Sequence, residues 1–255
     1  MRHLRSEFYQ MIHSKLWIIH VVVPMIGILL FAAYHVYVPQ NAMNTLVGFF
    51  EAVAMAFPFL IAMVISMNEE EEQKAGRFQR MLFVPYSTVR SHITKWIALE
   101  IMGLGATLLV VMGFGIMFRL SGQSILNLKD YFEMAVLIWA SMIGLYLMTY
   151  IVSFQWGKGF SLLLGIVGSL LAALMETGLG EGLWQFIPSA WGIRLVGELL
   201  TFMINPSLAD ETKHFLMNDI GLGIKLMMGM TSIFALIFVI WSKNWKGGTI
   251  QEEEY

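Results

Sequence analysis

Charged side chains and cysteine are what this sequence most lacks. Only 13% of the 255 residues are charged, whereas a soluble domain of this length carries roughly a quarter. That shortage excludes a soluble globular enzyme and a disordered chain, and no basic stripe is present that could bind nucleic acid. Cysteine is absent altogether, which excludes disulfide bonds, a thiolate nucleophile and a metal held by cysteine.

The sequence also lacks the motifs of nucleotide and zinc chemistry. No phosphate-binding loop of the form G-x-x-x-x-G-K-[ST] occurs, and WGKGFS at 156–161 has only the Gly-Lys pair. No zinc motif of the form H-E-x-x-H occurs either. We therefore do not expect the chain to hydrolyse ATP by itself, and we assign it no catalytic residue, no metal and no cofactor.

Apolar residues take the place of the missing charges. They make up 57% of the chain, whose mean hydropathy is +0.67. About 20 apolar residues suffice to span a bilayer, and only helices satisfy the backbone in a chain without alternating strand patterns. The sequence thus predicts an all-α polytopic membrane protein with a single transmembrane domain and six spans, at 16–37, 45–67, 96–118, 132–153, 160–177 and 220–241.

The distribution of Lys and Arg predicts the orientation of these spans. If both termini are cytoplasmic, the inner basic residues are Arg2, Arg5, Lys15, Lys74, Arg77, Arg80, Arg90, Lys95, Lys158, Lys243 and Lys246. The outer ones are then only Arg119, Lys129, Arg194, Lys213 and Lys225. Because basic residues favour the inner side, we expect a multi-pass protein of the plasma membrane with both termini in the cytoplasm.

Two segments outside the spans are amphipathic or broken. Residues 1–15 place Leu4, Phe8, Met11 and Ile12 on one face, which predicts a helix in the cytoplasmic interface, with a poorly ordered tail as the alternative. The outer segment 178–219 contains apolar stretches that are too short to span. It predicts re-entrant or interfacial helices before the last span, with an ordinary outer loop as the alternative.

The segment 68–95 carries the densest charge in the chain. Its acidic residues come first and its basic residues last, which suits the dipole of a helix running from about Glu69 to Leu82. Phe78 belongs to an apolar edge of this helix, and Pro85 ends it. Two interpretations remain open. One is a helix parallel to the membrane that offers a docking surface, and the other is a solvated run of charge that only orients the protein.

Features within the spans leave further alternatives. Glu51 and Glu100 lie within about two turns of a span end, so snorkelling or a polar neighbour competes with a proton relay as their explanation. Small residues recur every three or four positions in the fifth span. Such a face allows close helix approach, either within the chain or between two copies. The small residues are Ser161, Gly165, Gly168 and Ala172.

The whole arrangement resembles that of type-2 ABC exporter permeases. That family has an interfacial amino-terminal helix, six spans, a cytoplasmic coupling helix between spans two and three, and re-entrant helices before span six. The residues that carry the resemblance are Glu72, Gly76, Leu82, Pro85 and Lys95. The chain departs from the commoner Gly-Thr pair because Arg77 follows Gly76.

Within that family the chain is most similar to permease subunits of lantibiotic-immunity transporters of Gram-positive bacteria. The similarity rests on the chain length, on Lys15-Leu16-Trp17 at the start of the first span and on IPSAW at 187–191.

The resemblance implies a mechanism and a set of partners. A separate ATPase subunit, acting as a dimer, would engage a coupling segment made of Glu72, Gly76, Arg77, Phe78, Leu82 and Pro85. A second six-span permease, the same chain or a homologous one, would complete the transporter. The cargo would be a lantibiotic or a similar cationic antimicrobial peptide, taken from the membrane and expelled. The alternatives are another cargo, such as a drug, a lipid or a polysaccharide, or a non-transporting membrane scaffold or sensor partner.

Overall fold

A computed structural model describes residues 2–38, 41–83, 87–205 and 207–247. The secondary structure of these residues is helical throughout, in agreement with the prediction of an all-α chain. Six helices are long and apolar enough to cross a membrane. They are α2 (Leu16–Tyr37), α3 (Ala42–Lys74), α5 (Thr88–Leu120), α6 (Leu128–Trp156), α7 (Lys158–Glu176) and α9 (Asp210–Asn244).

Each predicted span falls on one of these six helices, and the helices mostly extend further. The first span, 16–37, coincides with α2, whereas α9 begins ten residues before the predicted sixth span. The residues by which the helices exceed the predicted spans are polar, so the hydropathy of the sequence places them in loops. Between α6 and α7 the predicted Gly-Lys-Gly turn is present, and Gly157 there adopts a φ of +87°, which is a conformation that favours glycine.

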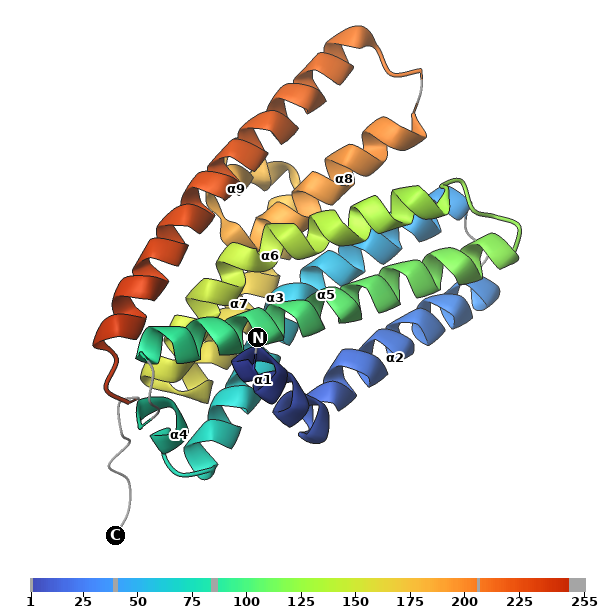
Figure 1. The fold of residues 1–255 in the computed structure, drawn as a ribbon. Helices are drawn as coiled ribbons and strands as arrows, with labels where there is room; N and C mark the ends of the chain where they lie inside the picture. Colours follow the sequence, from blue (N-terminus) through green and yellow to red (C-terminus); the bar gives the residue numbers. More distant parts are fainter. Residues whose placement is uncertain (1, 39–40, 84–86, 206, 248–255) are drawn as a thin grey trace.

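The bundle is densest around α3, which packs most extensively against α7. Helices α2 and α9 lie at opposite edges of the molecule, with α3, α5 and α6 between them (Figure 1). The small residues of the fifth span face α3: the Ser161 hydroxyl donates to the Ala62 carbonyl at 3.2 Å, and Ala172 is buried beside Ala54. This face is therefore a seam within the chain, which decides between the two alternatives left open by the sequence.

The segment between the second and third spans differs from its prediction. Instead of one helix from Glu69 to Leu82, α3 continues unbroken to Lys74, a turn follows, and α4 (Gln79–Leu82) is a single short turn of helix. The run of glutamates does not end α3, and two of these side chains form ion pairs. Glu70 pairs with Lys74 within the helix and Glu72 pairs with Lys95 of α5.

The two ends of the bundle are distinct. The amino-terminal helix α1 (Arg2–His13) is present as predicted and packs on α5 and α2. Of its predicted apolar face, Met11 is buried, but Ile12 is 54% exposed because it turns away from α5. The segment 178–219 forms three short 3₁₀ turns, the helix α8 (Trp191–Ile204) and the first turns of α9. We call the end with α1 and α4 the proximal end and the end with residues 178–187 the distal end.

The α3–α7 seam can be tested with one added methyl group. A Cβ at Gly165 would meet the Ala62 side chain and the Pro58 carbonyl, whereas a Cβ at Gly105 in α5 meets nothing within 4 Å. We expect Gly165→Ala to lower the free energy of unfolding by about 1–3 kcal/mol, because the two helices are forced apart. The measurement is denaturant unfolding in detergent micelles. Gly105→Ala is the control, and equal stability of the two variants would contradict the seam.

Candidate functional site

The proximal end is organised around the buried ammonium group of Lys95, near the start of α5. Only 2% of the Lys95 side chain is exposed. Its Nζ lies 2.6 Å from a carboxylate oxygen of Glu7 in α1 and 2.8 Å from one of Glu72 in α3. A buried charge is tolerated only when it is paired and hydrogen-bonded, so these contacts fix α1, α3 and α5 relative to one another.

The same network reaches the turn between α3 and α5. The Arg80 guanidinium of α4 donates to Glu72 at 2.9 Å and also contacts the Gln10 side chain of α1. Glu72 thereby accepts from two cations that come from different elements. The position of α4 is coupled in this way to the positions of three helices.

The turn itself has an unusual backbone. Gly76, Arg77 and Phe78 have φ values of +126°, +51° and +63° in succession. Positive φ is uncommon for residues other than glycine and costs about 1–3 kcal/mol at each such position. The turn caps α3, because the amides of Arg77 and Phe78 donate to the carbonyls of Gln73 and Glu72. Surrounding contacts must hold Arg77 and Phe78 in this conformation.

Those contacts come from an aromatic cluster beneath the turn. The Phe78 ring is 7% exposed and lies 5.3 Å from the Trp245 ring and 5.9 Å from the Phe154 ring, between ring centroids. Two hydrogen bonds fasten the cluster: His92 Nδ1 lies 3.1 Å from the Tyr150 hydroxyl, and the indole N–H of Trp245 donates to the Phe154 carbonyl at 3.1 Å. The aromatic cluster consists of Phe78, His92, Tyr150, Phe154, Phe238, Trp241 and Trp245. It joins the turn to α5, α6 and the end of α9.

The structure divides the sequence-predicted coupling residues into two groups. Glu72 and Phe78 are buried and face inward, whereas Arg77 is exposed on the outside of the turn. Gly76 and Leu82 are half-buried between these groups, and Pro85 lies outside the described residues. The outward face of the turn also includes residues that the sequence analysis did not single out. They are Gln73, Lys74, Ala75, Gln79, Arg80 and Phe83, and the Phe83 ring is 81% exposed.

Lys95 has a role that its place just before the predicted third span does not indicate. Its partner Glu7 lies 88 positions away in the chain. The available signal was that α5 carries apolar residues directly after Lys95, so an ionisable side chain at this position needs a partner from another element.

A second polar region lies at the distal end. A cavity of about 510 Å³ is lined by Glu51, Glu176, Glu181, Glu198 and Asp219 and by a single cation, Arg194. Asp219 accepts hydrogen bonds from the indole N–H of Trp184 at 3.0 Å and from the Gln185 amide at 2.6 Å. Side chains of the segment before α8 thus position a carboxylate of α9 at this cavity.

The two carboxylates predicted near the span ends have different surroundings. Glu51 contributes to the distal cavity. Glu100 is only 4% exposed and lies beside Trp96 of its own helix and Trp139 of α6, whose indole N–H donates to the Glu100 backbone carbonyl at 3.0 Å. Its burial excludes snorkelling to the bilayer surface, which leaves a polar neighbour and a proton relay as the alternatives for this residue.

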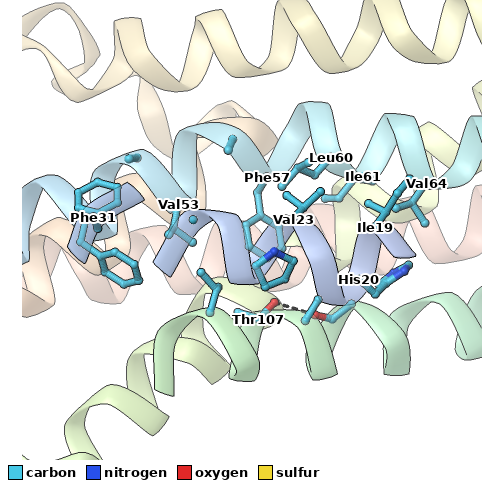
Figure 2. Close-up of a pocket in the computed structure, with 18 of the residues that line it drawn as sticks. Ile19, His20, Val23, Phe31, Val53, Phe57, Leu60, Ile61, Val64 and Thr107 are labelled. Carbon is cyan, nitrogen blue, oxygen red and sulfur yellow. Dashed lines mark hydrogen bonds between the residues drawn. The ribbon is translucent and has the colours of Figure 1, made fainter. Parts of the chain in front are cut away.

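A third cavity, of about 170 Å³, lies between α2, α3 and α5 within the spanning region (Figure 2). His20 and Phe31 mark its two ends in this view, with apolar side chains of α3 along one wall. Two of its polar side chains bond to their own helices: Thr107 donates to the Gly103 carbonyl at 2.7 Å, and His20 Nδ1 contacts the Leu16 carbonyl at 2.8 Å, while His20 Nε2 has no partner among the described residues. Such a lining suits a small apolar group that enters from lipid.

Comparison of the chain with models of protein families, with curated proteins and with solved structures finds no match. Function has to be argued from the sites themselves.

The Lys95 network makes a direct prediction about stability. Lys95→Met leaves Glu7 without its cation and leaves Glu72 paired only with Arg80, so we expect it to lower the free energy of unfolding by about 3 kcal/mol. Lys129→Met is the matched control, since it removes an exposed pair with Glu133 that contributes about 1 kcal/mol or less. The measurement is denaturant unfolding of both variants in micelles, and similar losses would refute the role of Lys95.

The distal cavity predicts a dependence of stability on pH. Burial, followed by a hydrogen bond and the charge of Asp219, raises the pKa of Glu198 from 4.5 to about 8. The folded protein therefore holds a proton that the unfolded chain releases above about pH 4.5, and this carboxyl lowers stability progressively as pH rises towards 8.

We accordingly expect Glu198→Gln to lose less thermal stability than the wild type between pH 5.5 and 8.5. Exposed Glu211 is the control, because Glu211→Gln should keep the wild-type slope. Identical pH slopes for all three proteins would contradict the assignment.

Proposed function

We propose that this chain is the permease subunit of an ATP-driven exporter, energised by a separate ATPase subunit that docks on the outward face of residues 73–83. One observation carries the proposal. The turn between the second and third spanning helices presents exposed side chains on one side and is fastened to four helices on the other. When a partner displaces such a surface, the displacement is transmitted to the spanning helices.

Transmission through the turn depends on two inward connections. Glu72 and Arg80 link it to α1 and α5 through Lys95 and Gln10. Phe78 links it to α6 and α9 through the rings of Phe154 and Trp245. Because these contacts are buried and interlocked, a displacement of α4 is carried to the spanning helices as a unit.

The partners follow from what the chain lacks. It has no phosphate-binding loop, so ATP hydrolysis is assigned to a separate subunit, which acts as a dimer. A dimeric motor engages two permeases, and the second six-span permease is another copy or a homologous chain. On this proposal the proximal end with its excess of Lys and Arg is cytoplasmic, and the membrane is the plasma membrane.

The cargo we propose is a lantibiotic or a similar cationic amphipathic peptide. The distal cavity, in which one arginine faces four carboxylates and the Glu198 carboxyl, whose pKa of about 8 keeps it mainly protonated at neutral pH, offers a favourable environment for positive charge on the outer side. The small apolar cavity between α2, α3 and α5 offers a place for an apolar side chain that enters from the bilayer. Export of a drug, a lipid or a polysaccharide is the alternative, and a non-transporting scaffold or sensor partner is a further one.

The proposal separates docking from transmission, and two phenylalanines test the distinction. Phe83→Ala removes an exposed ring, so we expect about tenfold less ATPase subunit to co-purify with the permease. Phe78→Ala removes a buried ring of the aromatic cluster. We expect this variant to retain the ATPase subunit but to lose the stimulation of ATP hydrolysis by a nisin-like peptide. The measurements are co-purification from the native host and peptide-stimulated hydrolysis in proteoliposomes.

The control is Phe132→Ala in α6, whose ring is 49% exposed, away from the turn. It should leave both measurements unchanged. If the Phe83→Ala variant retained the ATPase subunit as the wild type does, the proposed docking surface would be contradicted. A wild-type complex without peptide-stimulated hydrolysis would favour a scaffold or another cargo.

A further inference from the structure

A cleft of about 710 Å³ opens at the proximal end, beside the turn and separate from the Lys95 network. Its walls come from the end of α3, the turn before α4, the junction of α6 with α7, and the residues that follow α9. We call it the proximal cleft. Its lining residues that matter for the argument are Glu70, Lys74, Arg77, Trp156, Lys158 and Lys246.

Positive charge exceeds negative charge in the proximal cleft. Four basic side chains line it, against the carboxylates of Glu69 and Glu70. Glu70 is shared between two lysines, at 2.7 Å from Lys74 and 3.1 Å from Lys158. Arg77 and Lys246 are exposed and make no ion pair with any residue of the described part of the chain. The strained backbone at Arg77 holds one of these two free cations at the mouth of the cleft.

The other side of the proximal cleft is apolar and continuous with the surface of a spanning helix. Trp156 and Phe160 are 51% and 57% exposed, with ring centroids 6.4 Å apart. From Phe160 an exposed apolar stripe continues along α7 through Leu163, Val167 and Leu170. Aromatic side chains at this depth are typical of the boundary between headgroups and acyl chains.

We propose that the proximal cleft binds an anionic glycerophospholipid. Its phosphate lies between Arg77 and Lys246, beside the partly neutralised Lys74–Glu70–Lys158 group, and its acyl chains follow the stripe on α7. Basic pockets between spanning helices are suited to anionic headgroups, and each lysine or arginine near the surface contributes about a fivefold preference. The unpaired Glu69 carboxylate opposes the phosphate and limits the preference.

Continuity between the cleft and the stripe favours a lipid over a protein segment. A peptide from a partner would need only the charged mouth, and it would leave Trp156, Phe160 and the apolar wall of α7 to be covered by something else. A phospholipid covers both parts with one molecule that is already present in the bilayer. The inference requires only that the proximal end lies at a membrane surface, so it stands apart from the exporter proposal.

Quenching of Trp156 by brominated lipids tests this binding. The full chain is reconstituted into phosphatidylcholine vesicles in which a rising fraction of the lipid is brominated phosphatidylglycerol or, in parallel, brominated phosphatidylcholine. The signal of Trp156 is the difference between the wild type and Trp156→Phe. We expect phosphatidylglycerol to quench that signal at concentrations at least tenfold lower than phosphatidylcholine does.

The double variant Arg77→Gln with Lys246→Gln should lose that preference by an order of magnitude or more. Lys129→Gln with Lys225→Gln removes the same charge from exposed positions elsewhere and should keep it. Equal quenching by the two lipids in the wild type would overturn the proposal. So would an unchanged preference in the double variant. Quenching by brominated phosphatidylcholine in every variant verifies that the protein is folded and inserted.

Discussion

The ammonium group of Lys95 is buried, and the structure tolerates this charge because two carboxylates form ion pairs with it. Removing an ammonium group from water costs several kcal/mol, so Glu7 and Glu72 have to be present for the start of α5 to pack as it does. The amino-terminal helix, the end of α3 and the start of α5 are therefore arranged by one shared requirement. The turn at 75–78 and α4 depend on it as well, because Arg80 donates to the same carboxylate oxygen of Glu72 as Lys95 does.

This arrangement gives the proximal end a rigid interior beneath an exposed turn. Phe78 occupies the aromatic cluster, and its packing holds two residues other than glycine in left-handed conformations. Strain of this kind persists only where surrounding contacts enforce it, and it is found often at functional sites. In the exporter proposal the strain has a purpose, since it orients exposed side chains for a partner while the buried ones remain locked to the spans.

The fold was largely predictable because membrane spans are determined by local composition. The first span coincides with α2, and every predicted span lies on a long helix. The continuation of α3 through Glu69–Lys74 was not predictable, because four glutamates beside an apolar run usually mark the end of a helix. Glu72 and Glu70 pair with Lys95 and Lys158, which come from distant parts of the chain. Tertiary pairing thus overrode the local signal.

The sequence predicts a candidate site in this segment but not how its side chains divide between interior and surface. The spacing of Glu72, Gly76 and Leu82 indicates the segment, whereas burial of Phe78 and exposure of Phe83 depend on a turn that propensity disfavours. The partners of Phe78 lie in α6 and beyond the end of α9, and no sequence period links them to the loop. The acidic distal cavity likewise assembles from α3, α7, α8 and α9 only in the folded chain.

Site-specific cross-linking tests most directly whether an ATPase subunit binds the turn. Because the chain has no cysteine, an introduced cysteine is the only thiol that can react. Gln79→Cys places a single thiol on the outward face of α4, and Gln123→Cys places one at an exposed position in the loop between α5 and α6. In native membranes, a short bifunctional reagent should join the first to a protein whose sequence contains a phosphate-binding loop, and the second should give no such product. A cross-link to that protein from Gln123→Cys alone, or from neither position, would contradict the account.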